Sequence, residues 1–146
     1  MKRRMKAKQY LARIRLADVC IEQREAQAME LMELVAGMDP GDREAKYREL
    51  IRHVNGCISS WKELREDTLR NALGAIGNET AQKIIYLKYA KGLKLREVAD
   101  LIEYSKNYVC SLHAKAMREL DQMDFIKNAE KMREWRCGSG GADRMK

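Results

Sequence analysis

The sequence predicts an all-α protein: a long antiparallel helical hairpin followed by a C-terminal tri-helical helix-turn-helix. Its 146 residues contain one proline and one phenylalanine and are dominated by Ala, Leu, Met, Glu, Lys and Arg, which favour helices over strands. Two long segments also repeat apolar residues every seven positions, as packed helices do. After a glycine-containing break, two short helical segments and a third follow one another within a few residues.

The first predicted unit covers residues 1–76 and holds both seven-residue repeats. In the first repeat Arg24 interrupts the apolar positions, which are Tyr10, Ile14, Ala17, Ile21, Ala28, Leu31, Val35 and Met38. The second repeat contains Tyr47, Leu50, Val54, Cys57, Trp61, Leu64 and Thr68. Between them, Gly37 can end a helix and Asp39-Pro40 can begin one. The two segments should therefore fold back on each other as antiparallel rods.

Further apolar residues lie beside the two repeats. They are Met29, Met32, Leu34, Ile51, Ile58 and Leu69. Two helices alone bury little surface, so a second copy of the chain or another protein could cover these side chains. We expect a homodimer formed through the hairpin, and the alternative is a scaffold whose apolar stripe is only its own core.

Positive charge is concentrated at the N-terminus. Residues 1–17 carry seven Lys or Arg and no acid, which equals the net charge of +7 of the whole chain. Cations at the positive end of a helix dipole are unfavourable without an anionic partner. Three interpretations stay open: a solvated, frayed end, a contact with DNA or another polyanion, and a targeting peptide.

The second predicted unit covers residues 77–123. Its first helix can begin at Asn78, a good N-cap, and end at Gly92. A short helix from Leu95 follows, and a third helix starts after Ser105. Residues 124–146 are expected to form a short helical extension and a disordered, glycine-rich tail.

The third helix of this unit has one apolar face. Its predicted core positions are Val109, Leu112, Ala116 and Leu120, and the opposite face carries Lys106, Asn107, Cys110, Ser111, Ala114, Lys115 and Arg118. Lys106 can donate to guanine, Asn107 can pair with adenine, and Ser111 can contact either base. Lys115 and Arg118 are better placed for phosphates. A polar face is also ordinary on a surface helix, and the three-helix context is what favours DNA.

At these residues the chain resembles a known family. The run "ETAQKIIYLKYAKGLKLREVADLIEYSKNYVCSLHAKAMREL" is similar to region 4 of bacterial sigma factors, in its glycine-leucine turn, its acidic residue before Val-Ala and its terminal Ala-x-x-x-Leu. Residues 5–123 resemble the short phage-encoded, sigma-region-4-like regulators of Gram-positive bacteria, of the autolysin-regulator and late-transcription activator types.

The resemblance implies which residues meet DNA. It places Lys106, Asn107, Cys110 and Ser111 at an upstream promoter element, with Lys94, Arg96 and Lys115 near the backbone. The complete predicted DNA-binding set is Lys94, Arg96, Ser105, Lys106, Asn107, Tyr108, Cys110, Ser111, Lys115 and Arg118. Lys94 departs from the family, which usually has a serine or threonine cap there, so a frayed or shifted second helix is expected.

The resemblance also implies a mode of action. The N-terminal half lacks the aromatic-rich region with which sigma factors melt promoter DNA, so a self-sufficient sigma factor is not expected. The predicted function is a sequence-specific, DNA-binding transcriptional regulator of phage or prophage genes, with RNA polymerase as a candidate partner. Two alternatives stay open: the small terminase-like subunit of a phage DNA-packaging machine, and a protein-protein adaptor with a vestigial helix-turn-helix.

Other function classes find little support in the sequence. His53 and His113 neighbour no cysteine or carboxylate at a catalytic spacing, so no enzymatic activity is expected. The four cysteines are widely spread and do not match paired zinc ligands, so neither a metal nor another cofactor is expected. No uncharged run approaches the roughly 18 residues that a membrane span needs. We therefore expect a cytoplasmic protein without a membrane partner, and the resemblance implies that this cytoplasm is that of the bacterial host cell.

Overall fold

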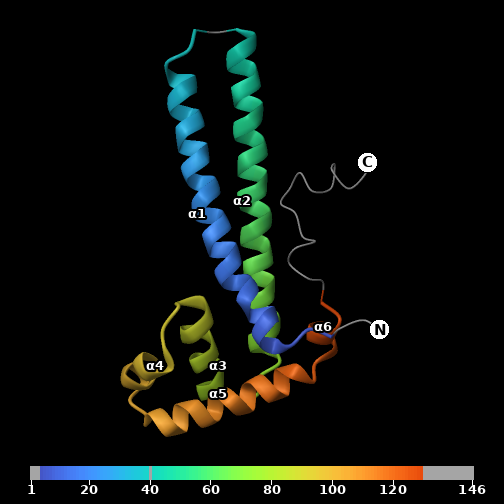
Figure 1. The fold of residues 1–146 in the computed structure, drawn as a ribbon, viewed down its shortest axis with the longest axis vertical. Coiled ribbons are helices and arrows are strands. Elements are labelled where there is room, and N and C mark those ends of the chain that lie inside the picture. The colour runs from blue at the N-terminus through green and yellow to red at the C-terminus, as the bar shows by residue number, and fades with distance from the viewer. Residues whose placement is uncertain (1–3, 40, 130–146) are drawn as a thin grey trace.

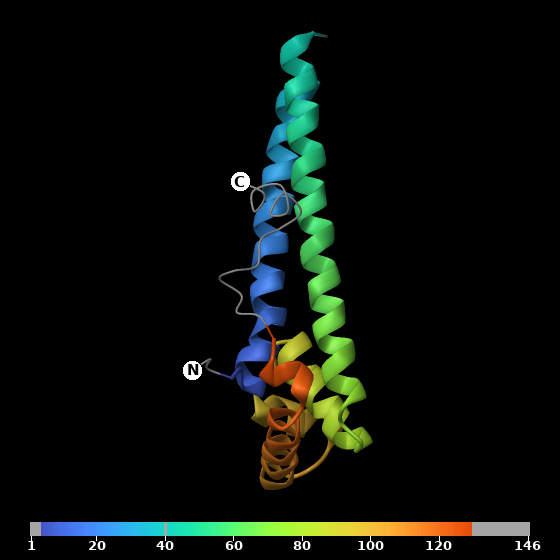
Figure 2. The ribbon, with the colours of Figure 1, turned by 90° about the vertical axis from the view of Figure 1, so that its right-hand side faces the viewer.

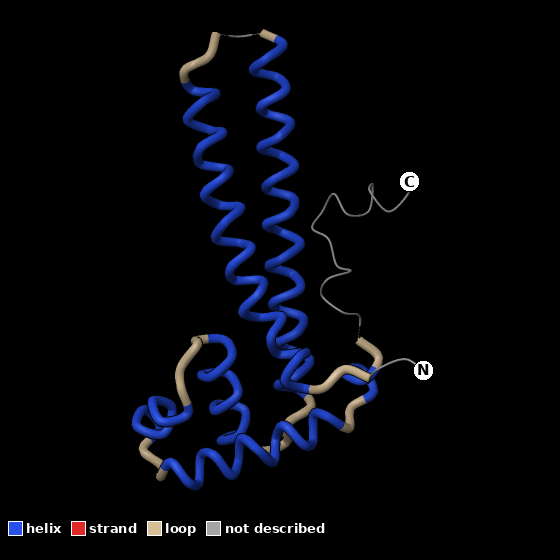
Figure 3. The backbone as a smooth tube through the Cα atoms, in the orientation of Figure 1, coloured by secondary structure: helices blue, strands red, loops and turns tan. Residues whose placement is uncertain are grey.

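The structure is a computed structural model that describes residues 4–39 and 41–129. Within these residues the chain forms helices, turns and loops and no strands (Figure 3). The prediction of an all-α protein is therefore confirmed. A short helix, α6 (Asp124–Lys127), lies where a helical extension was expected. The predicted disordered tail falls almost wholly outside the described residues.

Two long helices dominate the molecule. Helix α1 (Ala7–Ala36) and helix α2 (Asp42–Gly74) run antiparallel and lie side by side, and the remaining helices gather where α1 begins and α2 ends (Figures 1 and 2). The predicted repeats supply their contact: Ile14, Val54 and Trp61 are all buried. The periodicity of seven therefore located this interface correctly along most of its length.

The seven-residue repeat predicted the burial of one residue wrongly and missed another buried residue. Leu50 is 48% exposed, although the second repeat assigned it to the helix interface. A straight α-helix drifts by about 20° per heptad relative to a strict repeat of 3.5, so a stripe of this kind leaves the interface towards a helix end. Leu69, expected on the surface, is buried, because the start of α1 and the C-terminal helices pack around the end of α2.

Local signals set the boundaries of the C-terminal helices. Asn78 Oδ1 accepts from the amide of Ala81 (2.9 Å) and caps α3 (Glu79–Ile85). The chain continues as a π-helix, η1 (Tyr86–Ala90), which stops before Gly92, whose φ of +75° lies in the left-handed region that glycine adopts most easily. The predicted single helix is thus an α-helix that ends in a π-turn.

The next helix begins cleanly, although a frayed or shifted start was expected for it. Helix α4 spans Leu95–Ile102, and the amide of Lys94 donates to Glu97 Oε1 (2.8 Å). The side chain of Glu97, in the first turn, thus accepts a hydrogen bond from the amide of the residue before the helix, which is one of the two hydrogen bonds of a capping box. Glu103 then takes a left-handed conformation (φ 62°) and reverses the chain into α5 (Lys106–Asp121).

The start of α1 is held against the C-terminal helices rather than frayed. The amide of Met5 donates to the carbonyl of Lys127 (3.3 Å), and the amide of Ala7 donates to Asp121 Oδ1 (2.7 Å). Asp121 therefore caps a helix from which it is separated by 114 residues. From Met5 onwards, the interpretation of a frayed, solvated end is wrong.

One apolar cluster joins all these segments, and we call it the foot cluster. Its buried members come from α1, the α2 end, α3, η1, α5 and α6: Ala7, Tyr10, Leu11, Ile14, Leu69, Ala72, Ile76, Ala81, Ile85, Ala90, Ala116, Leu120 and Ile126. A second cluster, Ile84, Val98, Ala99 and Val109, lies between α3, α4 and α5. The two stretches predicted as separate units therefore share a hydrophobic core.

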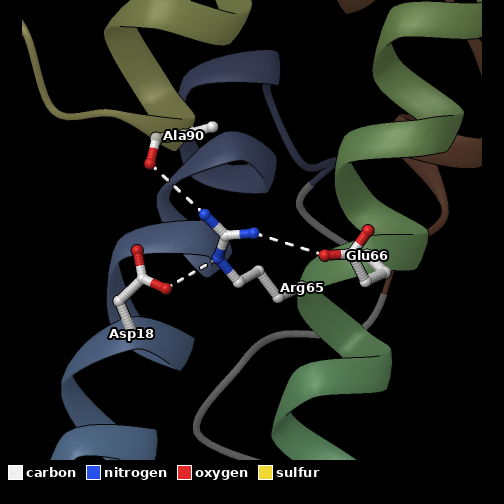
Figure 4. A network of polar contacts seen from close by, with 4 residues as sticks. All are labelled: Asp18, Arg65, Glu66 and Ala90. Atoms are coloured by element: carbon white, nitrogen blue, oxygen red, sulfur yellow. Dashed lines mark hydrogen bonds and ion pairs between the residues drawn. The ribbon is translucent and has the colours of Figure 1, made fainter.

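A polar contact reinforces the same junction. The guanidinium of Arg65 on α2 donates from Nε to Asp18 Oδ1 of α1 (2.6 Å) and from Nη2 to the carbonyl of Ala90 at the end of η1 (3.3 Å), and it also contacts Glu66 (Figure 4). One side chain thus links both long helices to the C-terminal helices, and satisfies a carbonyl that the π-turn leaves without a helical partner.

We predict that Ile14→Ala lowers the free energy of unfolding by about 2–5 kcal/mol, because the foot cluster cannot collapse around the cavity. Thermal and urea unfolding followed by circular dichroism will measure the loss. The control is Gln23→Ala on the same helix, where the side chain is exposed and the effect should stay within about 0.5 kcal/mol. Equal losses in both variants would contradict the arrangement.

Candidate nucleic-acid interface

Helix α5 presents one face to solvent because its other face is buried. Val109, Ala116 and Leu120 are buried against α3, α4 and the foot cluster, as the apolar spacing predicted. Ser105 Oγ accepts from the amide of Tyr108 (3.2 Å) and so fixes the first turn of the helix. Packing and capping together determine which side chains of α5 can reach a partner.

The solvent face carries a line of polar and small side chains. Asn107, Ser111, Ala114 and Arg118 follow one another at spacings of four, three and four, so they form a single stripe along the helix. Asn107 and Ser111 are exposed, and their side chains make no hydrogen bond to another described residue. Their donors and acceptors are therefore available to a partner.

Cations surround a depression at the N-terminal end of α5, which we call the Lys106 pocket. It encloses about 380 Å³ and is lined by Lys88, Lys94, Leu95, Arg96, Lys106 and Cys110. Four residues of the predicted set therefore meet at one place, from α4, its N-cap and α5. The set missed Lys88, which reaches the pocket from the π-turn; in the sequence, nothing distinguishes it from Lys83 or Lys91.

The structure separates two other predicted residues from that pocket. Lys115 lies beside Gly77 and Asn78 on another flank of α5, in a depression of about 340 Å³ that also includes Glu119. Arg118 lies at the opposite end of the helix, near the N-terminal segment of the chain. Lys115 is thus placed for a contact different from that of the Lys106 pocket.

Ser105 and Tyr108 have local roles in the structure. The Ser105 side chain is the cap of α5, so its oxygen already accepts a backbone hydrogen bond. The ring of Tyr108 lies 5.0 Å from that of Tyr104, and both residues are a little less than half exposed. Leu101, which is 62% exposed, lies in α4 shortly before the turn between α4 and α5.

The side chains of Tyr89 and His113 form a half-buried pair behind the exposed face of α5. His113 Nε2 is 3.0 Å from the hydroxyl of Tyr89, and the two rings are stacked with centroids 5.9 Å apart. Burial and, secondarily, the nearby charge of Lys88 lower the pKa of His113. Burial also raises the pKa of the Tyr89 hydroxyl. Both groups are therefore neutral near pH 7, which suits a pair packed between η1 and α5.

We predict that the free energy of unfolding decreases as the pH falls below about 6.5, the ordinary pKa of histidine. The folded pKa of His113 is lowered, so the unfolded chain binds the proton more readily and acid favours unfolding. Urea unfolding between about pH 7.5 and 5.5, above the pKa range of most carboxylates, will measure the slope of the free energy of unfolding against pH. His113→Gln should reduce it, and an unchanged slope would contradict this assignment.

The chemistry available at this surface is the binding of anions. The Lys106 pocket offers ammonium and guanidinium groups, and the stripe beside it offers an amide and a hydroxyl.

Among the described residues no group of three or more His, Cys, Asp or Glu is arranged to hold a metal ion. None of the described helices is both long and apolar enough to cross a membrane.

Comparison with known proteins does not identify a family. The chain matches no protein-family model, no curated protein and no solved structure.

Proposed function

We propose that the protein binds duplex DNA sequence-specifically by inserting the exposed face of α5 into the major groove. The observation that carries this proposal is the Lys106 pocket, where four cations surround the end of a helix whose solvent stripe begins with Asn107. Lysine and arginine bind phosphates, whereas an amide next to them can read a base edge. The pocket and the stripe lie side by side, as such an interface requires.

The order and packing of the short helices support the same mode of binding. Helix α4 and helix α5, joined by the left-handed turn at Glu103, act as a helix-turn-helix, with α3 packed against α5 as support. Cys110 and Ala114, both small, lie on the exposed side of α5 between longer polar residues. Small side chains there would let the helix backbone approach the bases closely.

The role in transcription rests on the resemblance to sigma-region-4-like phage regulators. On that basis the protein regulates phage or prophage genes in the host cytoplasm, together with RNA polymerase.

Residues 78–123 contain eight basic and six acidic side chains, so one module has little net charge with which to bind DNA. A homodimer through the exposed Met29, Met32 and Leu34 of α1 would bring two modules to one site and raise the affinity.

We predict that Asn107→Ala relaxes the preference for one base pair of the selected site at a cost of about 1–3 kcal/mol. Lys94→Gln should instead weaken binding to all sequences alike, because it removes a phosphate contact. Selection of bound sequences from a random duplex pool will define the site, and titrations with the site and its single-base variants will measure both effects.

The outcome separates DNA binding from an adaptor function. A DNA-binding protein should lose affinity steeply as the salt concentration rises, whereas an adaptor that binds through an apolar surface should not. Absence of any enriched sequence, together with no binding to duplex DNA at moderate salt, would overturn the proposal. Equal effects of Asn107→Ala on every base variant would show that α5 does not read bases at this position.

A further inference from the structure

A second basic depression lies at the far end of α5, and we call it the Arg118 pocket. It encloses about 370 Å³ and is lined by Arg4, Met5, Lys6, Arg118, Asp121, Gln122 and Lys127. Its cations come from three separate parts of the sequence: the segment before α1, the last turn of α5, and α6. They lie together because α1 begins beside the point where α5 ends (Figure 1).

The fold fixes the N-terminal side of this pocket. The amides of Met5 and Ala7 donate to Lys127 and Asp121, and Tyr10 packs edge-on against Phe125 with ring centroids 5.5 Å apart. The backbone next to Arg4 and Lys6 is thus anchored on both sides of the pocket. These two cations are held beside Arg118 instead of diffusing freely at the end of the chain.

The charge of this pocket is not balanced within the protein. None of the ion pairs between described residues includes Arg4, Lys6, Arg118 or Lys127. Asp121 is the one carboxylate in the lining, and one of its oxygens already accepts from the amide of Ala7. The start of α1 adds the positive end of its dipole. The pocket therefore has four cations and the positive end of α1, but only the carboxylate of Asp121 to balance them, and one oxygen of that carboxylate is already hydrogen-bonded. This excess of positive charge favours binding of an anion.

The position of the pocket relates it to the proposed DNA site. Arg118 belongs to the same exposed stripe of α5 as Asn107 and Ser111, so all three side chains project from one side of the helix. At 1.5 Å per residue, Lys106 and Arg118 lie about 18 Å apart along the axis. The major groove is about 12 Å wide and is bordered by phosphates on both sides, so a helix of this length lying in it can bring the cations at its two ends close to the backbones.

Resting on the proposed function, we infer that the Arg118 pocket binds the phosphodiester backbone of the DNA whose bases α5 reads. The Lys106 pocket holds the backbone at one end of the helix, and Arg4, Lys6, Arg118 and Lys127 hold it at the other. The basic N-terminal segment thereby becomes part of the interface. These contacts add affinity and orientation but carry no base preference of their own.

The test compares two double variants of the full chain that remove the same charge. In Arg4→Gln/Lys6→Gln the cations are lost from the pocket, while in the control, Lys46→Gln/Lys62→Gln, they are lost from the exposed surface of α2. All four side chains are exposed, so both variants should fold, which their circular dichroism will verify. Binding to the selected duplex and to a scrambled duplex is then measured at several salt concentrations.

We expect the Arg4/Lys6 variant to lose about 10-fold or more in affinity for both duplexes, and to reduce the slope of log K against log salt by up to about 2. Hydroxyl-radical footprinting should show loss of backbone protection at one edge of the site, while the selected sequence stays the same. The control variant should match the native protein in its footprint and differ little in affinity.

The failures of the two proposals are distinguishable. If the native chain selects a DNA sequence, but the Arg4/Lys6 variant keeps its affinity, salt slope and footprint, the inference about the Arg118 pocket is wrong and the proposed function stands. The inference is also wrong if the control variant weakens binding equally, because general charge then explains the loss. If the native chain binds no DNA, both are overturned.

Discussion

The first two turns of α1 pack into the foot cluster, and the placement of the other helices depends on this contact. Ala7, Leu11 and Ile14 are buried among residues of α2, α3, η1, α5 and α6. Without it, the two long helices and the C-terminal helices would be joined only by the short link after Gly74, the packing of the α2 end and the hydrogen bond from Arg65 to Ala90. Apolar burial is the dominant favourable term at such a junction, and the Asp121 and Arg65 contacts then fix its geometry because their hydrogen bonds are directional.

This junction also determines what α5 can present to a partner. One half of the helix is buried in the second cluster through Val109, and the other half in the foot cluster through Ala116 and Leu120. Held at both ends, α5 cannot rotate about its axis without losing buried apolar surface. The stripe that begins at Asn107 therefore has a fixed direction relative to the cations around it, and such preorganisation would reduce the cost of the proposed DNA binding.

The distribution of charge matters more than the total. The net charge of +7 equals that of residues 1–17, so the rest of the chain is neutral as a whole. Folding nevertheless gathers cations at both ends of α5, one group from α4, its N-cap and η1, and the other from the N-terminal segment and α6. In the proposed complex with DNA, these two basic surfaces would contact phosphates on either side of the polar helix face.

The sequence by itself determined the features that depend on near neighbours. Asn78, Gly92 and Ser105 mark helix ends because capping and the left-handed turn use backbone groups within a few residues, and seven-residue periodicity identifies packed faces. Only the tertiary structure decided that Leu69 is buried, that Lys88 joins the Lys106 pocket, and that the N-terminal cations meet Arg118. Those outcomes depend on contacts between segments as far as 114 residues apart, and neither local propensity nor periodicity contains information about which surfaces meet.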